Sequence, residues 1–542
     1  MAGERLTHEI IRHSLTYISE EMGVALRKSA YSPNIRERAD HSCAILDGSG
    51  RTVGQAEHIP VHIGSLPIGV ANTLNYLMEM GVEMAEGDMY LVNDPYIAGT
   101  HLNDVTLIRP VFKRGALVAI LANKAHHVDV GGISSASISF DARELFQEGV
   151  VLPPIRLMER NNLRTDYVRM IAANSRMPDT VMGDLRAQVA ANLLGERRLQ
   201  ELLGKISLET FEESVEYILE TTHALAVSEY RKLPHGLWRA VDYLELDEEL
   251  LKIEAAVLLG DDGVEVDFTG TSGQVEKPLN AVLGVTNAAV MYAVKTLINP
   301  DTPLNDGFLR AVRVRAPSQT IVNPVRPAPV AAGNLETSQR IVDVIYLALS
   351  NAIPERVPAA SHGSMNNLMM GGVDPRDGRR WAFYETIGGG SGARYGLDGV
   401  DGVQTNMTNT LNTPIEVMEH YYPLIFESYR LRDGSGGSGR WRGGMGLERS
   451  FTAKARIDVT IIGERRRIPP WGLLGGEPGQ PSQYLVRRKD GRIENLKSKD
   501  RTTLNPGDTL IIRTAGGGGY GKPSTLSITS TDEKTGPGSS AW

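Results

Sequence analysis

The strongest constraint on the fold is a pair of apolar runs, residues 105–112 and 116–122, separated by Lys113-Arg114-Gly115. Two apolar runs of this length on either side of a short, glycine-containing turn are typical of a β-hairpin. The strands then run antiparallel, so the residues just before the first strand lie beside the residues just after the second. The predicted hairpin therefore decides which distant residues meet at its open end.

Residue types that bind metals lie at this open end. His101-Leu102-Asn103-Asp104 precedes the first strand, and His126-His127 follows the second. If the strands pair about Arg114, residue 104 lies opposite about residue 124 and residue 102 opposite about residue 126. Imidazole and carboxylate ligands suit zinc, and they suit manganese or iron when further oxygens join. The alternative, in which these histidines only cap a loop and end a strand, stays open.

A second group of candidates lies upstream, in Arg36-Glu37-Arg38-Ala39-Asp40-His41-Ser42, just before an apolar strand predicted at residues 43–46. Asp40 can complete a metal site, and the planar guanidinium of Arg36 or Arg38 can bind an anionic group. The alternative is a charged surface turn. His58 and His62 have the spacing of helical zinc ligands, but Pro60 argues against a helix that holds both. We therefore assign these two histidines to pocket lining or to plain structure.

Composition excludes several kinds of protein and site. The 542 residues suffice for two or three domains, and 41% hydrophobic with 23% charged residues is ordinary for a soluble globular chain. A net charge of -8 without a basic block argues against a nucleic-acid partner. Because the sequence lacks an apolar stretch of about 18 residues and a signal peptide, we expect no membrane contact and a cytoplasmic location. The one cysteine, Cys43, excludes an internal disulfide and a thiolate zinc cluster.

Periodicity predicts a large α+β chain with mixed sheets, a central helical segment and a Gly-rich β C-terminal region. Apolar residues recur every three or four positions over residues 7–28 and over 177–222, which predicts a long amphipathic helix and a packed helical hairpin. The predicted regions are an α/β region that carries the metal site (1–160), a helical segment (161–233), an α+β region (234–433), a Gly-rich β region (434–521) and a disordered tail (522–542).

Two Gly-rich segments raise the question of nucleotide binding. Residues 516–522 nearly match a phosphate loop, but Pro523 stands where Ser or Thr would hold magnesium, and no helix can follow it. Residues 388–392 lack an acidic ribose ligand at a suitable distance in a βαβ unit. We therefore predict that both are loops with special backbone conformations and that this chain does not itself bind ATP.

Several longer motifs resemble, in order along the chain, those of the hydantoinase B/oxoprolinase family. Together they extend from residue 36 to residue 521, and such an ordered series is more specific than any single motif. The motifs are Arg36-Glu37-Arg38-Ala39-Asp40-His41-Ser42, Asn93-Asp94-Pro95-Tyr96 with Gly99-Thr100-His101-Leu102-Asn103-Asp104, Ala125-His126-His127-Val128-Asp129-Val130-Gly131-Gly132, Val266-Asp267-Phe268-Thr269-Gly270-Thr271-Ser272, and the glycine run from Ala515 to Gly521.

This resemblance implies the metal-containing B-type subunit of an ATP-dependent hydrolase of a cyclic amide, such as hydantoin, 5-oxoproline or a lactam. In that family an A-type partner with an actin-like kinase fold binds ATP with magnesium and activates the amide oxygen by phosphorylation, which implies a hetero-oligomer of A2B2 type. The matching motifs imply a divalent metal, with zinc ahead of manganese. The implied ligands are Asp40, His101, Asp104 and His126, and the implied catalytic residues are Arg36, Arg38 and His127.

Under this expectation a metal-activated water attacks the activated carbonyl carbon, while Arg36 or Arg38 stabilises negative charge on the phosphate or the tetrahedral oxygen. Two alternatives remain. Subunits of acetone and acetophenone carboxylases are similar to this family and use ATP to activate a ketone and bicarbonate. Alternatively, the metal is structural and the chain is a scaffold for its partner, although a ligand set without cysteine argues against a purely structural zinc.

Overall fold

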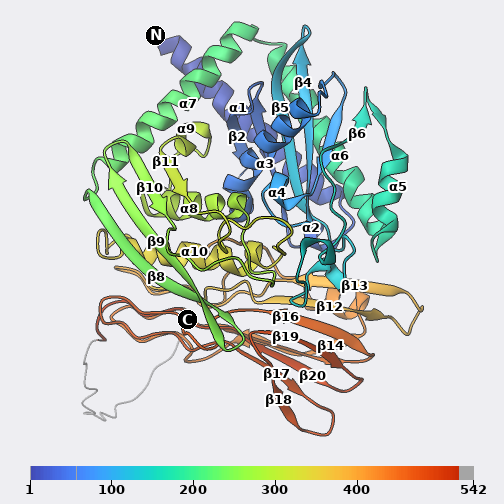
Figure 1. Cartoon of the computed structure of the whole chain (residues 1–542), viewed down its shortest axis with the longest axis vertical. Coiled ribbons are helices and arrows are strands. Elements are labelled where there is room, and N and C mark those ends of the chain that lie inside the picture. The colour runs from blue at the N-terminus through green and yellow to red at the C-terminus, as the bar shows by residue number, and fades with distance from the viewer. Residues whose placement is uncertain (1, 57, 299, 524–542) are drawn as a thin grey trace, which may run out of the picture.

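The computed structural model describes residues 2–56, 58–298 and 300–523. It confirms the α+β class, with four β-sheets and eleven α-helices among these residues (Figure 1). None of the helices in the described ranges is long and apolar enough to cross a lipid bilayer. The predicted tail lies outside the described residues from position 524 onward, and the division into five regions stays a prediction.

The candidate metal ligands belong to a seven-stranded antiparallel sheet in the order β2-β1-β5-β4-β3-β6-β7. Cys43 and Ile45 pack with α1 and α7, whereas Ala44 and Leu46 pack with α3, because successive side chains of a strand point to opposite faces. Helices therefore cover both faces of the sheet. The elements are α1 (Ala2–Ser29), α2 (Pro33–Arg36), β1 (His41–Asp47), β2 (Thr52–Ala56), α3 (Pro60–Glu79), β3 (Met89–Val92), α4 (Pro95–Ala98), β4 (Asp104–Lys113), β5 (Ala116–His126), β6 (Ile155–Glu159), β7 (Asn162–Leu163) and α7 (Leu208–Tyr230).

The β4–β5 hairpin forms as predicted, but its register differs from the expected one by two residues. Lys113 pairs with Ala116, so the turn contains only Arg114 and Gly115, both with positive φ (52° and 82°). Such two-residue turns match the twist of paired strands. A β-bulge after Val111 shifts the pairing by one more residue, and Asp104 lies directly opposite His126 instead of residue 124.

The helical stretch contains α5 (Thr165–Ala173), α6 (Pro178–Leu203) and α7. The expected packed hairpin of α6 and α7 is not formed, because both helices pack against α1 instead. Met22 of α1 lies beside Gly195 of α6, and His8 of α1 stacks on Tyr217 of α7 with ring centroids 4.6 Å apart. The amphipathic pattern predicted the helices correctly but carried no information on which element covers their apolar faces.

The middle of the chain forms a mixed four-stranded sheet in the order β11-β10-β9-β8, in which β10 and β11 are parallel. Helix α10 packs on β8 and β9, and α8 packs on both α10 and α3, which joins this part to the seven-stranded sheet. A π-helix, Gly333–Thr337, leads into α10. The other bounds are β8 (Gly236–Leu246), β9 (Glu249–Gly260), β10 (Gly263–Asp267), α8 (Leu283–Ile298), α9 (Asp306–Leu309), β11 (Val312–Arg315) and α10 (Ser338–Leu349).

Two antiparallel sheets, β13-β12-β16-β19 and β14-β15-β20-β17-β18, share one hydrophobic core in the C-terminal part of the chain (Figure 1). Their elements are β12 (Asn367–Val373), β13 (Arg380–Glu385), α11 (Ile415–Tyr421), β14 (Leu424–Leu431), β15 (Leu447–Ala453), β16 (Ile457–Ile462), β17 (Gln483–Arg487), β18 (Ile493–Asn495), β19 (Lys499–Leu504) and β20 (Thr509–Arg513).

The glycine run that follows β20 is buried among other backbone segments. A Cβ atom at Gly516, Gly517, Gly518 or Gly519 would collide with a main-chain oxygen of a neighbouring segment. Only glycine permits backbones to approach this closely. Close backbone packing therefore accounts for the run that nearly matches a phosphate loop.

Candidate metal centre

The observed hairpin register brings two of the predicted ligands side by side. Because Asp104 on β4 and His126 on β5 are directly opposite each other, their side chains share one face of the sheet. His101 joins them from the loop before β4, where the Asp104 N–H donates to the His101 carbonyl over 3.1 Å. All three residues are buried, and together they form a group that could hold a metal ion.

Three atoms of this group form a nearly equilateral triangle. His101 Nε2 lies 3.0 Å from Asp104 Oδ1 and 3.1 Å from His126 Nδ1, and the latter lies 3.1 Å from Asp104 Oδ1. Two ligands bound to one ion at ~2.1 Å and roughly 90–110° apart lie about 3.0–3.4 Å from each other. The triangle therefore has the dimensions expected of neighbouring ligands of a single ion.

Protons alone cannot satisfy all three sides of the triangle. If both nitrogens carry protons and donate to Asp104, the two N–H groups face each other. If either nitrogen is unprotonated, its lone pair faces the carboxylate. A further buried atom, His126 Nε2, has no hydrogen-bond partner among the described residues, and Asp104 Oδ2 has only His62 Nε2 nearby, at 3.4 Å. A cation removes the conflict, so the residues present fit a divalent metal.

His101 is held in the tautomer that a metal ligand needs. Its Nδ1 lies 3.1 Å from the carbonyl oxygen of Ala331, which can only accept, so Nδ1 carries a proton and Nε2 is the nitrogen that points into the triangle. The N–H groups of Ala331 and Val330 each donate to the Glu148 carboxylate over 2.9 Å. Burial raises the pKa of Glu148 to about 7. A buried acid thus fixes the residue whose carbonyl orients His101.

Lys124 fixes the segment that delivers His101 to the site. Its Nζ donates to the Ala98 carbonyl and to Thr100 Oγ1, both over 2.9 Å. Gly99 between them ends α4 with a left-handed φ of 82°. Lys124 is completely buried, and this burial lowers its pKa to about 8. The loop before His101 is therefore tied to β5, the strand that carries His126.

The charges of the group support an ionised carboxylate. Burial would raise the pKa of Asp104, but the charge of His101 and hydrogen bonds from the surrounding histidines hold that pKa well below its ordinary value. Burial would likewise lower the pKa of His101, but Asp104 raises it above its ordinary value. For His126, burial prevails and its pKa is lowered. One anionic and one neutral ligand are therefore already favoured without any ion.

Asp40 lies beside the triangle but outside the closest group. Its main-chain oxygen accepts from the His126 N–H over 3.1 Å, and its side chain lines the same small hollow as Asp104 and His126. The position agrees with a role as an additional ligand, which stays a prediction. No sequence pattern indicated that the Asp40 backbone would also hold β5 in place.

The two arginines of the upstream motif differ in position. Arg38 is fully buried, donates to the Tyr384 carbonyl (3.0 Å) and to Thr386 Oγ1 (3.2 Å), and stacks 4.7 Å from the Tyr384 ring. Tyr384 stacks in turn on His126, with ring centroids 4.9 Å apart. Arg38 therefore supports the wall of the site. Arg36 is partly exposed and pairs with its neighbour Glu37 at 2.9 Å, away from the triangle.

His127 does not join the triangle. Because neighbouring residues of a strand point to opposite faces, its side chain points away from that of His126 and lies 2.9 Å from Gln188 Oε1 on α6. The His127 N–H donates to the Asn103 carbonyl over 2.8 Å, and the Asn103 side-chain amide donates to the His127 carbonyl over 2.9 Å. The catalytic role expected for His127 stays a prediction, and its position favours a structural contact.

His62 is the histidine that sequence reasoning placed least well. Its Nε2 lies 3.4 Å from Asp104 Oδ2, and its Nδ1 lies 3.0 Å from Ser42 Oγ. Ser42 Oγ already accepts from the Ile59 N–H over 3.3 Å, so its proton is available to His62 Nδ1 and the Nε2 proton points at Asp104. Pro60 is the first residue of α3, which separates His58 from the helix as expected and places His62 in its first turn.

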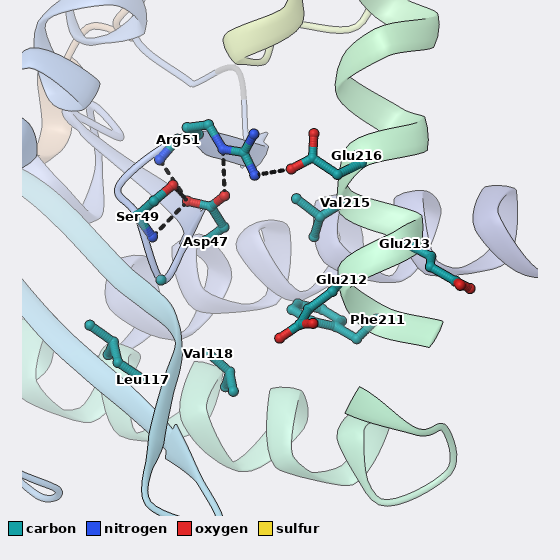
Figure 2. A pocket seen from close by; sticks show the side chains of 11 residues that line it. Asp47, Ser49, Arg51, Leu117, Val118, Phe211, Glu212, Glu213, Val215 and Glu216 are labelled. Atoms are coloured by element: carbon teal, nitrogen blue, oxygen red, sulfur yellow. Dashed lines mark hydrogen bonds and ion pairs between the residues drawn. The ribbon is translucent and has the colours of Figure 1, made fainter. Parts of the chain in front are cut away.

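The hollow at the triangle is small, about 20 Å³, and is lined by Asp40, His62, Asp104, His126 and Tyr384 among others. That volume holds about one water molecule or one ion. A hollow of about 730 Å³ lies at the opposite end of β1 and β5, beside the turn after Asp47 and the start of α7 (Figure 2). Arg51 bridges Asp47 and Glu216 there. The roomier hollow is thus separate from the residues that could bind metal.

Comparison with known proteins shows the family to which the chain belongs. The hydantoinase B/oxoprolinase family model matches residues 4–523. An uncharacterized protein of Methanocaldococcus jannaschii is 48% identical over 520 residues, which cover 96% of this chain and 91% of that protein. A 5-oxoprolinase of Dictyostelium discoideum is 32% identical over 95% of this chain, but the match covers only 40% of that longer protein.

Two solved structures share the fold. The ATP-dependent caprolactamase of Pseudomonas jessenii superposes with a TM-score of 0.89 at 28% identity, covering 96% of this chain and 91% of that one. An acetone carboxylase structure also gives a TM-score of 0.89, over 96% of this chain and 76% of that one, but its 18% identity supports similarity of fold alone. With a family model that spans nearly its whole length, the chain belongs to the hydantoinase B/oxoprolinase family.

Proposed function

We propose that this chain is the metal-binding B-type subunit of an ATP-dependent hydrolase of cyclic amides. Its partner would be an A-type subunit with an actin-like kinase fold that binds ATP with magnesium, in an assembly of A2B2 type. Lactams and 5-oxoproline are the substrate classes that the names of the relatives suggest. A cytoplasmic location is part of the proposal because the reaction consumes ATP.

One observation carries this proposal: the triangle of His101, Asp104 and His126, with His101 locked in the ligand tautomer. Asp40 is the fourth ligand we propose, and zinc remains ahead of manganese as the metal because two imidazoles and carboxylates suit it. A divalent ion held by these residues would polarise a carbonyl group and lower the pKa of a bound water. The neighbouring side chains then have to orient the ligands, exclude bulk water and admit the substrate.

The wall of the hollow suits these tasks. Tyr384 covers His126 and is itself covered by Arg38, so this side of the site is closed to water. Met365 and Met407 line the hollow on other sides, and methionine is the apolar side chain that adapts its shape most readily. Because the present hollow holds about one water, a ring substrate has to displace such side chains as it enters.

The carboxylase alternative differs in the bond that forms. A hydrolase opens the amide ring with water, whereas a ketone carboxylase forms a carbon–carbon bond with bicarbonate. We favour hydrolysis because the caprolactamase is the solved structure with the higher identity, 28% against 18%.

The proposal can be tested with the chain co-purified with its A-type partner. Hydantoin, 5-oxoproline and caprolactam are supplied with ATP, and ring opening, ADP release and metal content are measured together. We expect ring opening of at least one substrate in proportion to ADP. Incorporation of labelled bicarbonate into a ketone product, without ring opening, would support the carboxylase instead. Unchanged activity after full metal removal would contradict a catalytic role of the metal.

A further inference from the structure

Helix α1 carries large apolar side chains on its outward face. Leu6, Ile10, Tyr17 and Val24 are 63%, 55%, 64% and 49% exposed. Their spacings of four, seven and seven residues put them on one line along the helix, which we name the α1 seam. The seam spans 18 residue steps, from residue 6 to residue 24, or about 27 Å at ~1.5 Å per step. It is as long as the contact surface of a short coiled coil.

The body of the chain already uses the opposite face of the helix. Ile11, Leu15, Ile18, Met22 and Leu26 are buried, and α1 packs through this face against α6, α7, β1 and β2. A surface helix with one apolar face directed at the core is expected to present polar residues to solvent. The α1 seam instead places apolar side chains at the centre of the solvent-facing side of the helix. Heptad spacing on a solvent-facing line is typical of a helix that pairs with another helix.

We propose that two copies of this chain associate through the α1 seam, with the two α1 helices antiparallel and a two-fold axis at Tyr17. Three of the four seam residues are symmetric about Tyr17, because Ile10 and Val24 each lie seven positions from it, whereas Leu6 has Lys28 as its counterpart. The antiparallel pairing therefore places Ile10 of one copy against Val24 of the other and Tyr17 against its own counterpart. A two-fold contact needs this self-complementarity.

The charges beside the seam favour the antiparallel orientation. With the axis at Tyr17, Glu9 of one copy faces residue 25 of the other, within one turn of Arg27, and the symmetry repeats this pair. Glu9 already pairs with Arg12 of its own helix, and Arg27 uses its Nε to bind the Arg36 carbonyl, which leaves the Arg27 terminal nitrogens available. In a parallel pairing Glu9 would face Glu9 and Arg27 would face Arg27. Like charges in those positions oppose association.

Disulfide trapping of the full chain tests the register. The natural cysteine, Cys43, is completely buried, and burial raises the pKa of its thiol, so an introduced surface cysteine is the reactive one. Tyr17→Cys is expected to form a disulfide-linked dimer at least about tenfold faster than Met78→Cys, an exposed apolar control, because paired thiols experience an effective concentration on the order of mM. Leu6→Cys is expected to cross-link with Lys28→Cys in a mixture but slowly with itself.

Sedimentation velocity over a range of concentrations gives the second measurement. Tyr17→Glu is expected to weaken self-association about tenfold or more, whereas Met78→Glu leaves it unchanged. Equal cross-linking of the Tyr17→Cys and Met78→Cys chains would overturn self-pairing, and rapid self-linking of Leu6→Cys would overturn the antiparallel register. A chain that is monomeric alone, and that loses a co-purifying protein on Tyr17→Glu, would assign the seam to that other protein. The α1 pairing does not depend on the metal site, so either proposal can be wrong while the other is right.

Discussion

Two of the buried clusters of charged residues differ in how their charge is balanced. In the first, Arg340 and Arg465 surround Asp343 and Asp242: Arg340 Nη1 lies 2.7 Å from Asp343 Oδ2, and Arg465 Nη2 lies 3.0 Å from Asp242 Oδ2. This cluster connects β8, α10 and the residues after β16. In the second, the metal-site triangle, the Asp104 carboxylate faces the two imidazoles of the triangle and that of His62, and no permanently charged cation contacts it within 4 Å among the described residues.

The difference shows which buried cluster has its charges paired within the chain. Guanidinium groups supply both charge and hydrogen bonds to Asp343, so removing any member leaves a buried charge without its partner. The triangle lacks a comparable permanently charged cation. The arginine cluster should therefore contribute to the stability of the fold, whereas the triangle should contribute to binding and reaction.

The largest expected effect is on activity. Asp104→Ala and Asp104→Asn should lower the turnover of the complex with its A-type partner by at least about 100-fold, because even partners that only orient metal ligands account for roughly 10–100-fold. Thermal unfolding of the metal-free chain should change little, since the triangle does not balance its own charges. Full turnover in the Asp104→Ala chain would contradict the proposed site.

Asp343→Ala should have the reverse profile. Removal of this carboxylate leaves Arg340 and Arg465 buried without it, so the free energy of unfolding should fall by about 3–5 kcal/mol. The chain that remains folded should keep its metal content. Asp377→Ala, an exposed surface acid, is the matched control and should change stability by less than about 0.5 kcal/mol in a denaturant titration. Equal stability of the Asp343→Ala and Asp377→Ala chains would contradict the distinction between the two clusters.

Glu148→Gln should weaken metal binding without removing a ligand. The amide presents its NH2 group to one of the two N–H donors of Val330 and Ala331, which loosens the carbonyl that orients His101. Metal affinity measured by calorimetry should fall about 10–100-fold. Glu144→Gln, four residues away and exposed, is the control. Affinity that falls equally in both variants would show a general effect of lost charge.

The same acid predicts a pH dependence of stability in the metal-free chain. Burial raises the pKa of Glu148 from 4.5 to about 7, so the folded chain holds this proton more tightly than the unfolded chain does. Its stabilising contribution is therefore complete below about pH 4.5 and is lost as the pH rises through about 7. The difference in unfolding free energy between wild type and Glu148→Gln should shrink along this range. A constant difference would show that Glu148 does not titrate there.

The smallest effect is expected from His127→Gln. This change alters the hydrogen bond with Gln188 on the far face of β5 and should cost about 1 kcal/mol of stability. Metal content and metal affinity should stay at the wild-type level. Loss of metal in this variant would place His127 among the ligands and would contradict the separation of the two faces of β5.

The sequence predicted the parts of this site that depend on local pattern. The hairpin, its two strands and the convergence of Asp104 and His126 follow from the alternation of apolar runs around a glycine-containing turn. The register was wrong by two residues because the two-residue turn and the β-bulge after Val111 each shift the pairing by one, and neither has a pattern that periodicity detects. Asp104 and His126 nevertheless meet, because both shifts act in the direction that brings His126 opposite Asp104.

Contacts between distant segments could not be predicted in this way. Glu148, Ala331 and Tyr384 reach the triangle from three different parts of the chain, and nothing near them in sequence indicates it. His62 was visible as a histidine beside Pro60, and recognising proline as the first residue of a helix would have placed it in the first turn of α3. The exposed line on α1 was hidden because the same periodicity that predicted the helix describes its buried face.

Metal stoichiometry of the purified full chain tests the central claim most directly. Elemental analysis and calorimetric titration with zinc and with manganese should give one tightly bound divalent ion per chain. Asp104→Asn should remove that binding, while Asp343→Asn, in the protein that remains folded, should retain it. Failure of the wild-type chain to bind either ion, or equal binding by the Asp104→Asn chain, would contradict the claim that the triangle is a metal centre.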